Sequence, residues 1–323
     1  MRRPSYLVFA FLFVIFAAQS ALAEEILELN KSFIEKYKNN LTISVHYLVD
    51  AAPKRPNPAK NDGDLHIAGR AAEIGLDNIE LHHQYFDAAL AALAGGAADY
   101  VQCQGVLAWV SETNRGHVLD LAAHILKPGG VMAVGYNCLP GWTPMVAFQQ
   151  MLWTLADGLP GTPTQRFETA LEQLRATGIF EAGHWEWIDE MRGRLPTDYF
   201  AHEYLNRHWT PLWSGAVLEA AAERGLALAG QARPNRLRAD FALKAAWRET
   251  LSTIANPAAR ECALDLLTRN WFRTDLFVKQ RYARLSATEQ AKARMQGWWS
   301  APRPLGEASF EARTAAGTIR FDN

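Results

Sequence analysis

Short apolar runs alternate with longer amphipathic stretches along the middle of the chain. The runs at 79–83, 100–106 and 131–136 have the length and composition of buried strands. Between them, 87–94 and 115–126 repeat apolar residues at helical spacing. Strands that alternate with helices of about ten residues predict an α/β fold built on a doubly wound parallel sheet.

The pattern becomes helical in the second half of the chain. We expect helices at 145–157, 164–177, 184–194 and 214–224, followed by a short strand at 226–229. Beyond residue 240 the spacing is again helical to about residue 296, and the tail from Pro302 has the composition of a loop. A parallel sheet is therefore expected to be followed by a mostly helical region.

Residues 1–23 have the composition of a secretory signal peptide. Arg2 and Arg3 form a basic start, an apolar run covers 7–18, and Ala21-Leu22-Ala23 matches a cleavage site. The run is shorter than the roughly 20 residues that span a bilayer. The segment predicts a periplasmic or secreted protein with no stable membrane insertion after signal cleavage.

The composition changes near residue 60. None of the 22 glycines precedes Gly63, and residues 24–60 contain five lysines and one arginine, against four lysines and 21 arginines in 61–323. Alternation at 41–49 predicts a strand, and three prolines mark 51–64 as a linker. We hypothesise that residues 1–60 have a different origin from the rest, which would make the working protein cytoplasmic.

Bulk properties exclude several classes of function. The chain of 323 residues has a formal net charge of −1, which gives no reason to expect nucleic acid as a partner. Its three cysteines contain no Cys-x-x-Cys pair and indicate neither a disulfide framework nor a zinc site. His202 and His208 would point in different directions from a helix and could not bind the same metal ion, so no metal is expected.

Three separated blocks carry a resemblance to a known family. The blocks are GVLAWV at 105–110 with LKPGG at 126–130 and YNCLPGW at 136–142, DYFAHEYLN at 198–206, and NWFRTDLFV at 270–278. Within the first block, Pro128-Gly129-Gly130 is expected to form the turn before the strand at 131–136. They resemble the bacterial class I S-adenosylmethionine (SAM)-dependent methyltransferases that carry a methyltransferase regulatory domain, a group that includes protein-lysine methyltransferase-like proteins. The resemblance implies a Rossmann-like sheet, SAM as cofactor, and methyl transfer to a protein lysine or another nucleophilic acceptor.

The resemblance also divides the chain into segments. After the signal peptide at 1–23, the expected parts are a non-matching segment and linker at 24–63, a partial methyltransferase domain at 64–150, a regulatory and helical region at 151–300, and a tail at 301–323. Such enzymes open with a strand and a glycine-rich loop that lets the backbone approach SAM, and no such loop occurs in this chain. We therefore expect a sheet that is incomplete at its N-terminal side and an activity that is impaired. The alternatives are a catalytically inactive binding or regulatory protein of this fold, or an exported protein with an unrelated role.

The resemblance places the retained part of a cofactor site at two strand ends. It implies SAM contacts from Asp87, after the third strand, and from Gln104 and Gly105 at the end of the fourth strand. For Asp87 the alternative is a helix N-cap. For Gln104-Gly105 the alternative is a plain turn from strand to helix.

An acceptor pocket is expected beside these cofactor residues. Tyr136 and Asn137 end the fifth strand, at the edge where ligands bind in open α/β sheets. Trp142 follows shortly after and is expected to form a wall of the pocket, with packing in the core as the alternative. No residue is assigned as catalytic.

Overall fold

The computed structural model describes residues 85–232 and 243–279 in full. It also describes residues 286, 288, 289 and 292, and the backbone of the strands at 7–13, 41–47, 79–83, 311–314 and 317–320. Most of the predicted signal peptide and the proline-rich linker lie outside the described residues. The fold therefore rests on the central part of the chain and on the backbone of these outer strands.

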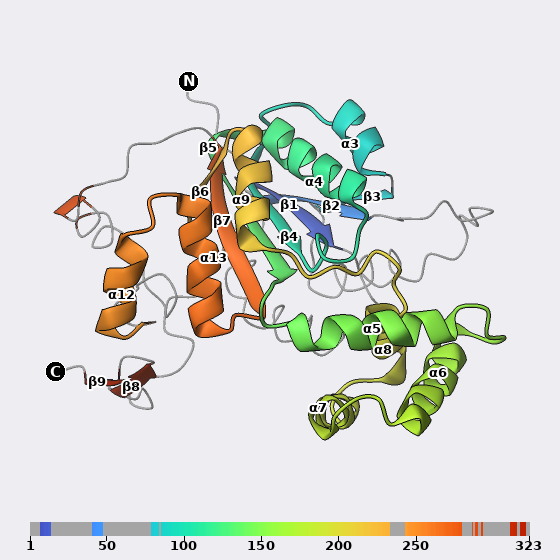
Figure 1. Ribbon diagram of the computed structural model, residues 1–323. Coiled ribbons are helices and arrows are strands. Elements are labelled where there is room, and N and C mark those ends of the chain that lie inside the picture. Colours follow the sequence, from blue (N-terminus) through green and yellow to red (C-terminus); the bar gives the residue numbers. More distant parts are fainter. Residues whose placement is uncertain are drawn as a thin grey trace.

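Seven strands form one mixed sheet in the order β3-β2-β1-β4-β5-β7-β6 (Figure 1). Strands β1 to β5 pair in parallel, and β7 pairs antiparallel with both β5 and β6. The order reverses between β1 and β4, which is the place where ligands bind in sheets of this type. The doubly wound α/β sheet is as predicted. The strands are β1 Leu7–Phe13, β2 Leu41–Tyr47, β3 Ile79–His83, β4 Ala98–Gln104, β5 Leu126–Asn137, β6 Leu226–Gln231 and β7 Phe272–Lys279.

The N-terminal side of the sheet differs from the expectation. We expected missing strands, but the backbone of β1 pairs with β2 on one side and with β4 on the other, with Leu7 opposite Leu41 and Phe9 opposite Tyr100. The strand predicted at 41–49 is β2. The apolar run that was assigned to the signal peptide supplies β1, because a short apolar run fits a central strand as well as it fits an export signal.

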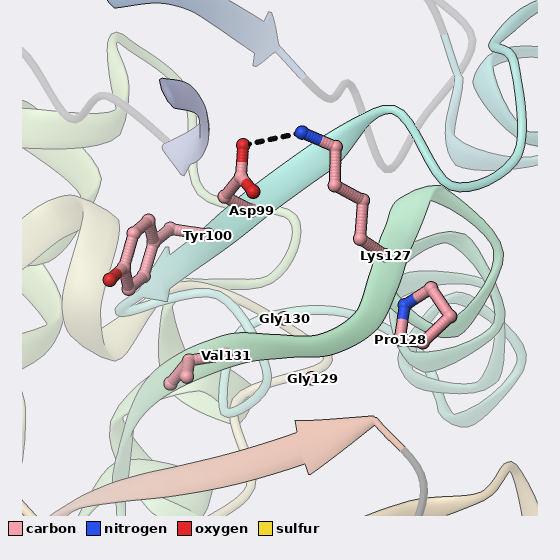
Figure 2. Close-up of a pocket in the computed structure, with 7 residues that line it drawn as sticks. All are labelled: Asp99, Tyr100, Lys127, Pro128, Gly129, Gly130 and Val131. Atoms are coloured by element: carbon pink, nitrogen blue, oxygen red, sulfur yellow. Dashed lines mark hydrogen bonds and ion pairs between the residues drawn. The ribbon is translucent and has the colours of Figure 1, made fainter. Parts of the chain in front are cut away.

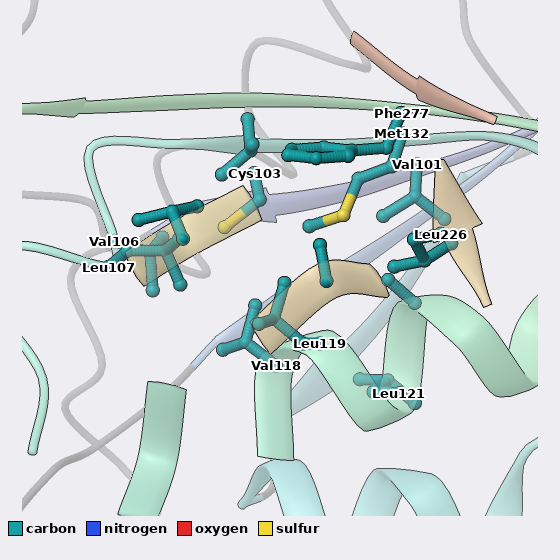
Figure 3. Close-up of a cluster of buried hydrophobic side chains, with 14 of the residues drawn as sticks. Val101, Cys103, Val106, Leu107, Val118, Leu119, Leu121, Met132, Leu226 and Phe277 are labelled. Carbon is teal, nitrogen blue, oxygen red and sulfur yellow. The ribbon is translucent and has the colours of Figure 1, made fainter. Parts of the chain in front are cut away.

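Helices α3 (Phe86–Ala92), α4 (Glu112–Ile125) and α9 (Ser214–Glu223) cover one face of the sheet, as Figure 1 shows. The Ser111 side chain caps α4 by accepting a hydrogen bond from the backbone N–H of Asn114. Figure 3 shows the core beneath these helices, where Cys103, Met132 and Phe277 from three strands are fully buried. Burial of each such large apolar side chain stabilises the fold by about 1.5–3 kcal/mol.

Four helices follow β5 and form a separate apolar cluster at the lower right of Figure 1. The capping box of Thr162 and Gln165 starts α6, and Gly178, with a φ of 65°, ends it. The apolar faces of the helices meet around Phe148, Phe167 and Phe200. The helices predicted at 145–157, 164–177 and 184–194 are confirmed. The four are α5 Thr143–Ala156, α6 Pro163–Thr177, α7 Ala182–Arg192 and α8 Thr197–Tyr204.

The helical pattern that we expected from 240 to 296 is only partly correct. Helices α12 (Ala245–Ser252) and α13 (Pro257–Thr268) are present, but the next segment is the strand β7. Its buried positions include Arg273 and Asp275, so the apolar alternation that marks a strand is hidden. The predicted loop after Pro302 is also wrong in part, because β8 (Glu311–Thr314) and β9 (Gly317–Arg320) pair antiparallel.

The Lys-Pro-Gly-Gly sequence at 127–130 is not a turn before β5 but lies within it. Ala98 pairs with Leu126 and Tyr100 pairs with Val131, so four residues of β5 lie opposite Asp99 alone. Gly129 has a φ of 81°, which glycine tolerates without strain. The irregularity allows the strand to begin earlier than the sequence predicts.

Candidate functional site

The end of β4 has the backbone geometry that a ligand-binding turn requires. Gly105 has a φ of 64°, and its N–H donates to the carbonyl of Gly135 at 3.0 Å. A Cβ added to Gly135 would lie 2.2 Å from Gln104 Oε1, so the amide of Gln104 lies directly over that glycine. The predicted pair Gln104 and Gly105 therefore sits at the carboxyl edge, between β4 and β5.

Asp87 lies on the first turn of α3 and is exposed. The N-cap of this helix is Tyr85, so the alternative role of Asp87 as N-cap does not apply. Its Oδ1 accepts a hydrogen bond from the backbone N–H of Ala88 at 2.8 Å. The contacts of Asp87, Gln104 and Gly105 with SAM remain predictions.

The side chain of Tyr136 points into a buried network of charges and not toward solvent. Its hydroxyl donates to Asp275 Oδ2 at 2.6 Å, and burial together with Asp275 raises its pKa. Arg273, which is 0% exposed, donates to Asp275, Asp265 and Glu261. The third sequence block thus places a buried ion cluster between β7 and α13.

A second buried carboxylate lies where β5 ends. Glu203 of α8 accepts hydrogen bonds from Trp109 Nε1 at 3.1 Å, Trp209 Nε1 at 3.0 Å and Asn137 Nδ2 at 3.3 Å. Burial raises the pKa of Glu203 to about 7, although the three hydrogen bonds oppose this shift. Asn137, one of the predicted pocket residues, thus contacts the carboxylate of Glu203, which was not predicted as a site residue.

Sequence reasoning missed Glu203 as a site residue. Its hydrogen-bond partners Trp109 and Asn137 precede it by 94 and 66 residues, a distance that no local pattern covers. One signal was present, because Glu203 lies at helical spacing beside Phe200 and Tyr204 on the apolar face of its helix. A charged residue at such a position is rare unless it has polar partners.

Trp142 lies at the centre of a cluster of indole rings. Its ring contacts Trp187, Trp209 and Trp271 with centroid distances of 6.2, 5.5 and 6.4 Å, and all three contacts are edge-to-face. Trp142 is 8% exposed and Trp271 is 49% exposed. We call these four residues the indole cluster. Trp142 is thus a buried residue of this cluster, and its role as a wall of an acceptor pocket stays a prediction.

The three sequence blocks meet at this edge. Trp109, Asn137 and Trp142 come from the first block, Glu203 from the second, and Trp271 from the third. The backbones are in direct contact there, since Cys138 N–H donates to the Trp271 carbonyl and Gly141 N–H to the Asn270 carbonyl, both at 3.0 Å. The blocks that define the resemblance therefore build one structural unit.

The substitution Gly141→Ala is expected to destabilise the chain by about 1–3 kcal/mol, because its methyl group would overpack this contact. A Cβ at Gly141 would lie 2.4 Å from Trp271 Cα and 2.6 Å from the Asn270 carbonyl oxygen. Gly183→Ala is the control, since its Cβ meets nothing within 4 Å on α7, and alanine favours a helix by up to about 1 kcal/mol. Urea unfolding checks both variants, and equal stability of the two would contradict the close contact.

A hollow of about 190 Å³ lies at the opposite end of β4 and β5, beside the irregular start of β5 (Figure 2). Lys127 Nζ and Asp99 Oδ2 form an ion pair of 2.6 Å across it. It is lined by Asp99, Tyr100, Lys127, Pro128, Gly129, Gly130 and Val131. None of the predicted site residues reaches this hollow.

Neither a membrane-spanning helix nor a metal-binding cluster occurs in the described part of the chain. Within it, no helix has the length and apolar character that a membrane crossing needs. The same residues contain no group of three or more histidine, cysteine or carboxylate side chains arranged to hold a metal ion. Cys103, Cys138 and Cys262 form no disulfide among the described residues, and the Cys138 thiol donates a hydrogen bond to the Asn270 carbonyl.

Residues 196–279 match the family model of the predicted methyltransferase regulatory domain. Among curated proteins, the chain is 25% identical over 193 residues to an uncharacterized protein of Synechocystis sp., covering 58% of this chain and 38% of that one. It is 35% identical over 57 residues to an uncharacterized protein of Rickettsia prowazekii, covering 18% and 23% of the two chains. The match thus spans well under half the length of these relatives.

Among solved structures, PKMT2 from Rickettsia typhi superposes over 87% of this chain and 50% of its own, with a TM-score of 0.60 and 17% identity. The same protein in complex with AdoHcy gives a TM-score of 0.61. A likeness at this identity shows a common fold. Residues 196–279 therefore match the predicted methyltransferase regulatory domain, and the chain has a Rossmann-like fold in common with PKMT2.

Proposed function

We propose that this protein is a SAM-dependent methyltransferase and that its acceptor is a lysine side chain of a protein. The observation that carries the proposal is the strand order β3-β2-β1-β4-β5-β7-β6 with an antiparallel β7, in a fold shared with a structure that contains AdoHcy. The regulatory-domain match at 196–279 supports it. The lysine acceptor follows from the likeness to PKMT2, a protein lysine methyltransferase.

The described residues fit half of a SAM site. Gly105 has the left-handed backbone that brings a strand end close to a ligand, and the exposed Asp87 lies after β3, at the same edge. The other half would come from residues that follow β1 and β2, which lie outside the described residues. No metal is part of the proposal.

The cofactor supplies a methyl group on a positively charged sulfur, a good leaving group. The acceptor nitrogen uses its lone pair to form a bond to the methyl carbon while the carbon–sulfur bond breaks. An ammonium group has no free lone pair, so the lysine must lose a proton to the solvent before it reacts, and the sulfur leaves as the neutral thioether of S-adenosylhomocysteine. The chain aligns the two reactants at the carboxyl edge and excludes water there.

Calorimetric titration of the full chain with SAM and with S-adenosylhomocysteine tests the proposal. We expect micromolar binding of both ligands, because the thioether product keeps every group of SAM except the methyl. ATP serves as a control for binding that depends on the adenine alone. A folded chain that binds neither SAM nor S-adenosylhomocysteine would contradict the proposal.

A second candidate is a binding or regulatory protein that has the fold but no methyl-transfer activity. One observation favours it, since residues 14–40, between β1 and β2, contain no glycine. A side chain at every position of this connection would hinder the close approach of backbone and cofactor. The same titration separates the two candidates, because this one predicts no binding of either SAM or S-adenosylhomocysteine.

A further inference from the structure

The carboxylate of Glu203 connects α8 to the ends of two strands of the sheet. Its Oε2 accepts a hydrogen bond from Trp109 Nε1, and its Oε1 accepts hydrogen bonds from Asn137 Nδ2 and Trp209 Nε1. Trp109 lies in the turn that follows β4, where cofactor contacts are predicted, and Asn137 is the last residue of β5. One buried side chain thus joins this turn to the neighbouring strand and to α8.

The hydrogen bond to Trp109 acts on the backbone at the end of β4. A Cβ added to Gly105 would lie 3.7 Å from the Trp109 ring, so the ring packs directly against this glycine. The N–H of Gly105 donates to the Gly135 carbonyl at 3.0 Å, which joins the turn to β5. The position of the Trp109 ring therefore limits where the backbone of Gly105 can lie.

The chain just after α8 holds the same turn by its backbone. Asn206 Nδ2 donates to the Trp109 carbonyl at 2.9 Å, and the Thr210 N–H donates to the Ala108 carbonyl at 2.8 Å. The Asn206 side chain is itself oriented, because its Oδ1 accepts a hydrogen bond from the His208 N–H at 2.8 Å. Together with the bond to the carboxylate, three hydrogen bonds connect this segment to the turn.

The groups that hold the turn belong to the region that matches the regulatory-domain family model. The match covers residues 196–279, which include Glu203, Asn206 and Thr210, whereas β4 and β5 precede it. A binding site works only when its ligand-facing groups are held to within about 0.5 Å, and supporting hydrogen bonds provide this precision. The matched region is therefore placed to fix the geometry of the predicted cofactor site.

We propose that Glu203 is a positioning residue that holds the turn at Gly105, through the Trp109 ring, in the arrangement that binds the cofactor. The inference rests on the proposed function and adds to it that the regulatory-domain region supports the cofactor site directly. A carboxylate suits this role, because its two oxygens serve three donors from different parts of the chain. Glu203 touches neither reactant and acts through Trp109 alone.

Amide hydrogen exchange of the full chain at about pH 8, above the pKa of Glu203 of about 7, tests the positioning role without a ligand. The reporting amides are those of Gly105, Trp109 and Thr210. In Glu203→Gln we expect them to exchange about tenfold faster, because glutamine has one acceptor oxygen and turns an NH2 group toward a donor. Amides inside α6 are the reference that reveals loosening of the whole helical cluster. Unchanged exchange at the turn would overturn the proposal.

A second variant keeps the test independent of the folding of Glu203→Gln. Asn206→Asp retains the acceptor for the His208 N–H but loses the donor to the Trp109 carbonyl. Asn206 is half-buried, so the change disturbs little packing. We expect the same three amides to exchange about three- to tenfold faster than in the natural chain. Natural exchange rates in this variant would show that β4 and β5 hold the turn without the segment after α8.

Calorimetric titration with S-adenosylhomocysteine then shows whether the turn serves the cofactor. In folded Glu203→Gln and Asn206→Asp we expect the dissociation constant to rise about tenfold. A merely structural role would lower the free energy of unfolding and leave the affinity of the folded protein unchanged. Leu251→Ala is the control, because it removes a side chain that is 7% exposed from a separate small cluster and should destabilise the chain without weakening binding.

The two measurements separate the possible failures. Faster exchange at the turn with natural affinity for S-adenosylhomocysteine in both variants would overturn the proposal, since Glu203 would then stabilise the fold only. Weaker binding in Leu251→Ala as well would also contradict it, because any loss of stability would then impair the site. Failure of the proposed function is a different result, namely a folded natural chain that does not bind S-adenosylhomocysteine.

Discussion

Replacing Arg273 by methionine is expected to lower the free energy of unfolding by about 3–5 kcal/mol, because it leaves buried carboxylates without their cation. The guanidinium donates to Asp275 at 2.8 Å and to Asp265 at 2.9 Å, and none of the three side chains is exposed. The pKa of Asp275 is raised by its burial, which shows how poorly this carboxylate is solvated. Removal of the cation would leave both carboxyl groups buried with only neutral hydrogen-bond donors, Ser214 and Asn270 for Asp265 and Tyr136 for Asp275.

The matched control is Arg192→Met on α7. Arg192 bonds Glu168 at 2.6 Å, but both side chains are 33% exposed, and ion pairs at the surface contribute about 1 kcal/mol or less. Urea unfolding followed by far-ultraviolet circular dichroism measures both variants. Similar losses for Arg273→Met and Arg192→Met would show that the buried network does not hold β7 to α13.

The stability of the natural chain is expected to fall by about 3 kcal/mol, relative to Glu203→Gln, between about pH 4.5 and pH 8. The pKa of Glu203 rises from an ordinary value of 4.5 to about 7 because the side chain is buried. Its neutral form is therefore favoured by folding. The stabilisation is complete below the unfolded pKa and is lost as the pH rises through the folded pKa.

Glutamine removes this titration, so the difference between the two unfolding curves reports Glu203 alone. Tyr199 and Tyr204 also face Glu203, but their pKa values are raised by burial and by its charge, so they do not titrate in this range. Glu168→Gln is the control, because it removes a carboxylate that is 33% exposed and paired with Arg192. A constant difference between the natural chain and Glu203→Gln across the range would contradict the buried titrating carboxylate.

The fold could be predicted wherever apolar spacing and burial agree. Helices α5, α6 and α7 each present one apolar face to a common cluster. The helical spacing of their apolar residues is therefore visible in the sequence, and their predicted positions are confirmed. Strand β7 could not be predicted in this way, because Arg273 and Asp275 occupy its buried face. Charged residues there require partners on α13 that the sequence does not reveal.

The candidate site was predicted at its strand ends and missed at its centre. The resemblance implies Gln104 and Gly105, and the rule that ligands bind at the carboxyl edge of a parallel sheet indicates Asn137; all three lie at that edge. Glu203 could not be placed, because its partners come from distant segments. The predicted location of the protein, its protein partner and the contacts of individual residues with SAM remain predictions.

Strand β1 lies within the segment that the sequence predicts to be a signal peptide. Leu7–Phe13 lies between β2 and β4, and a cut after Ala23 would remove it. The sheet would then separate into two parts with unpaired edges, which favour association with other chains. The apolar residues on which the signal-peptide prediction rests are therefore the residues that join the two halves of the sheet.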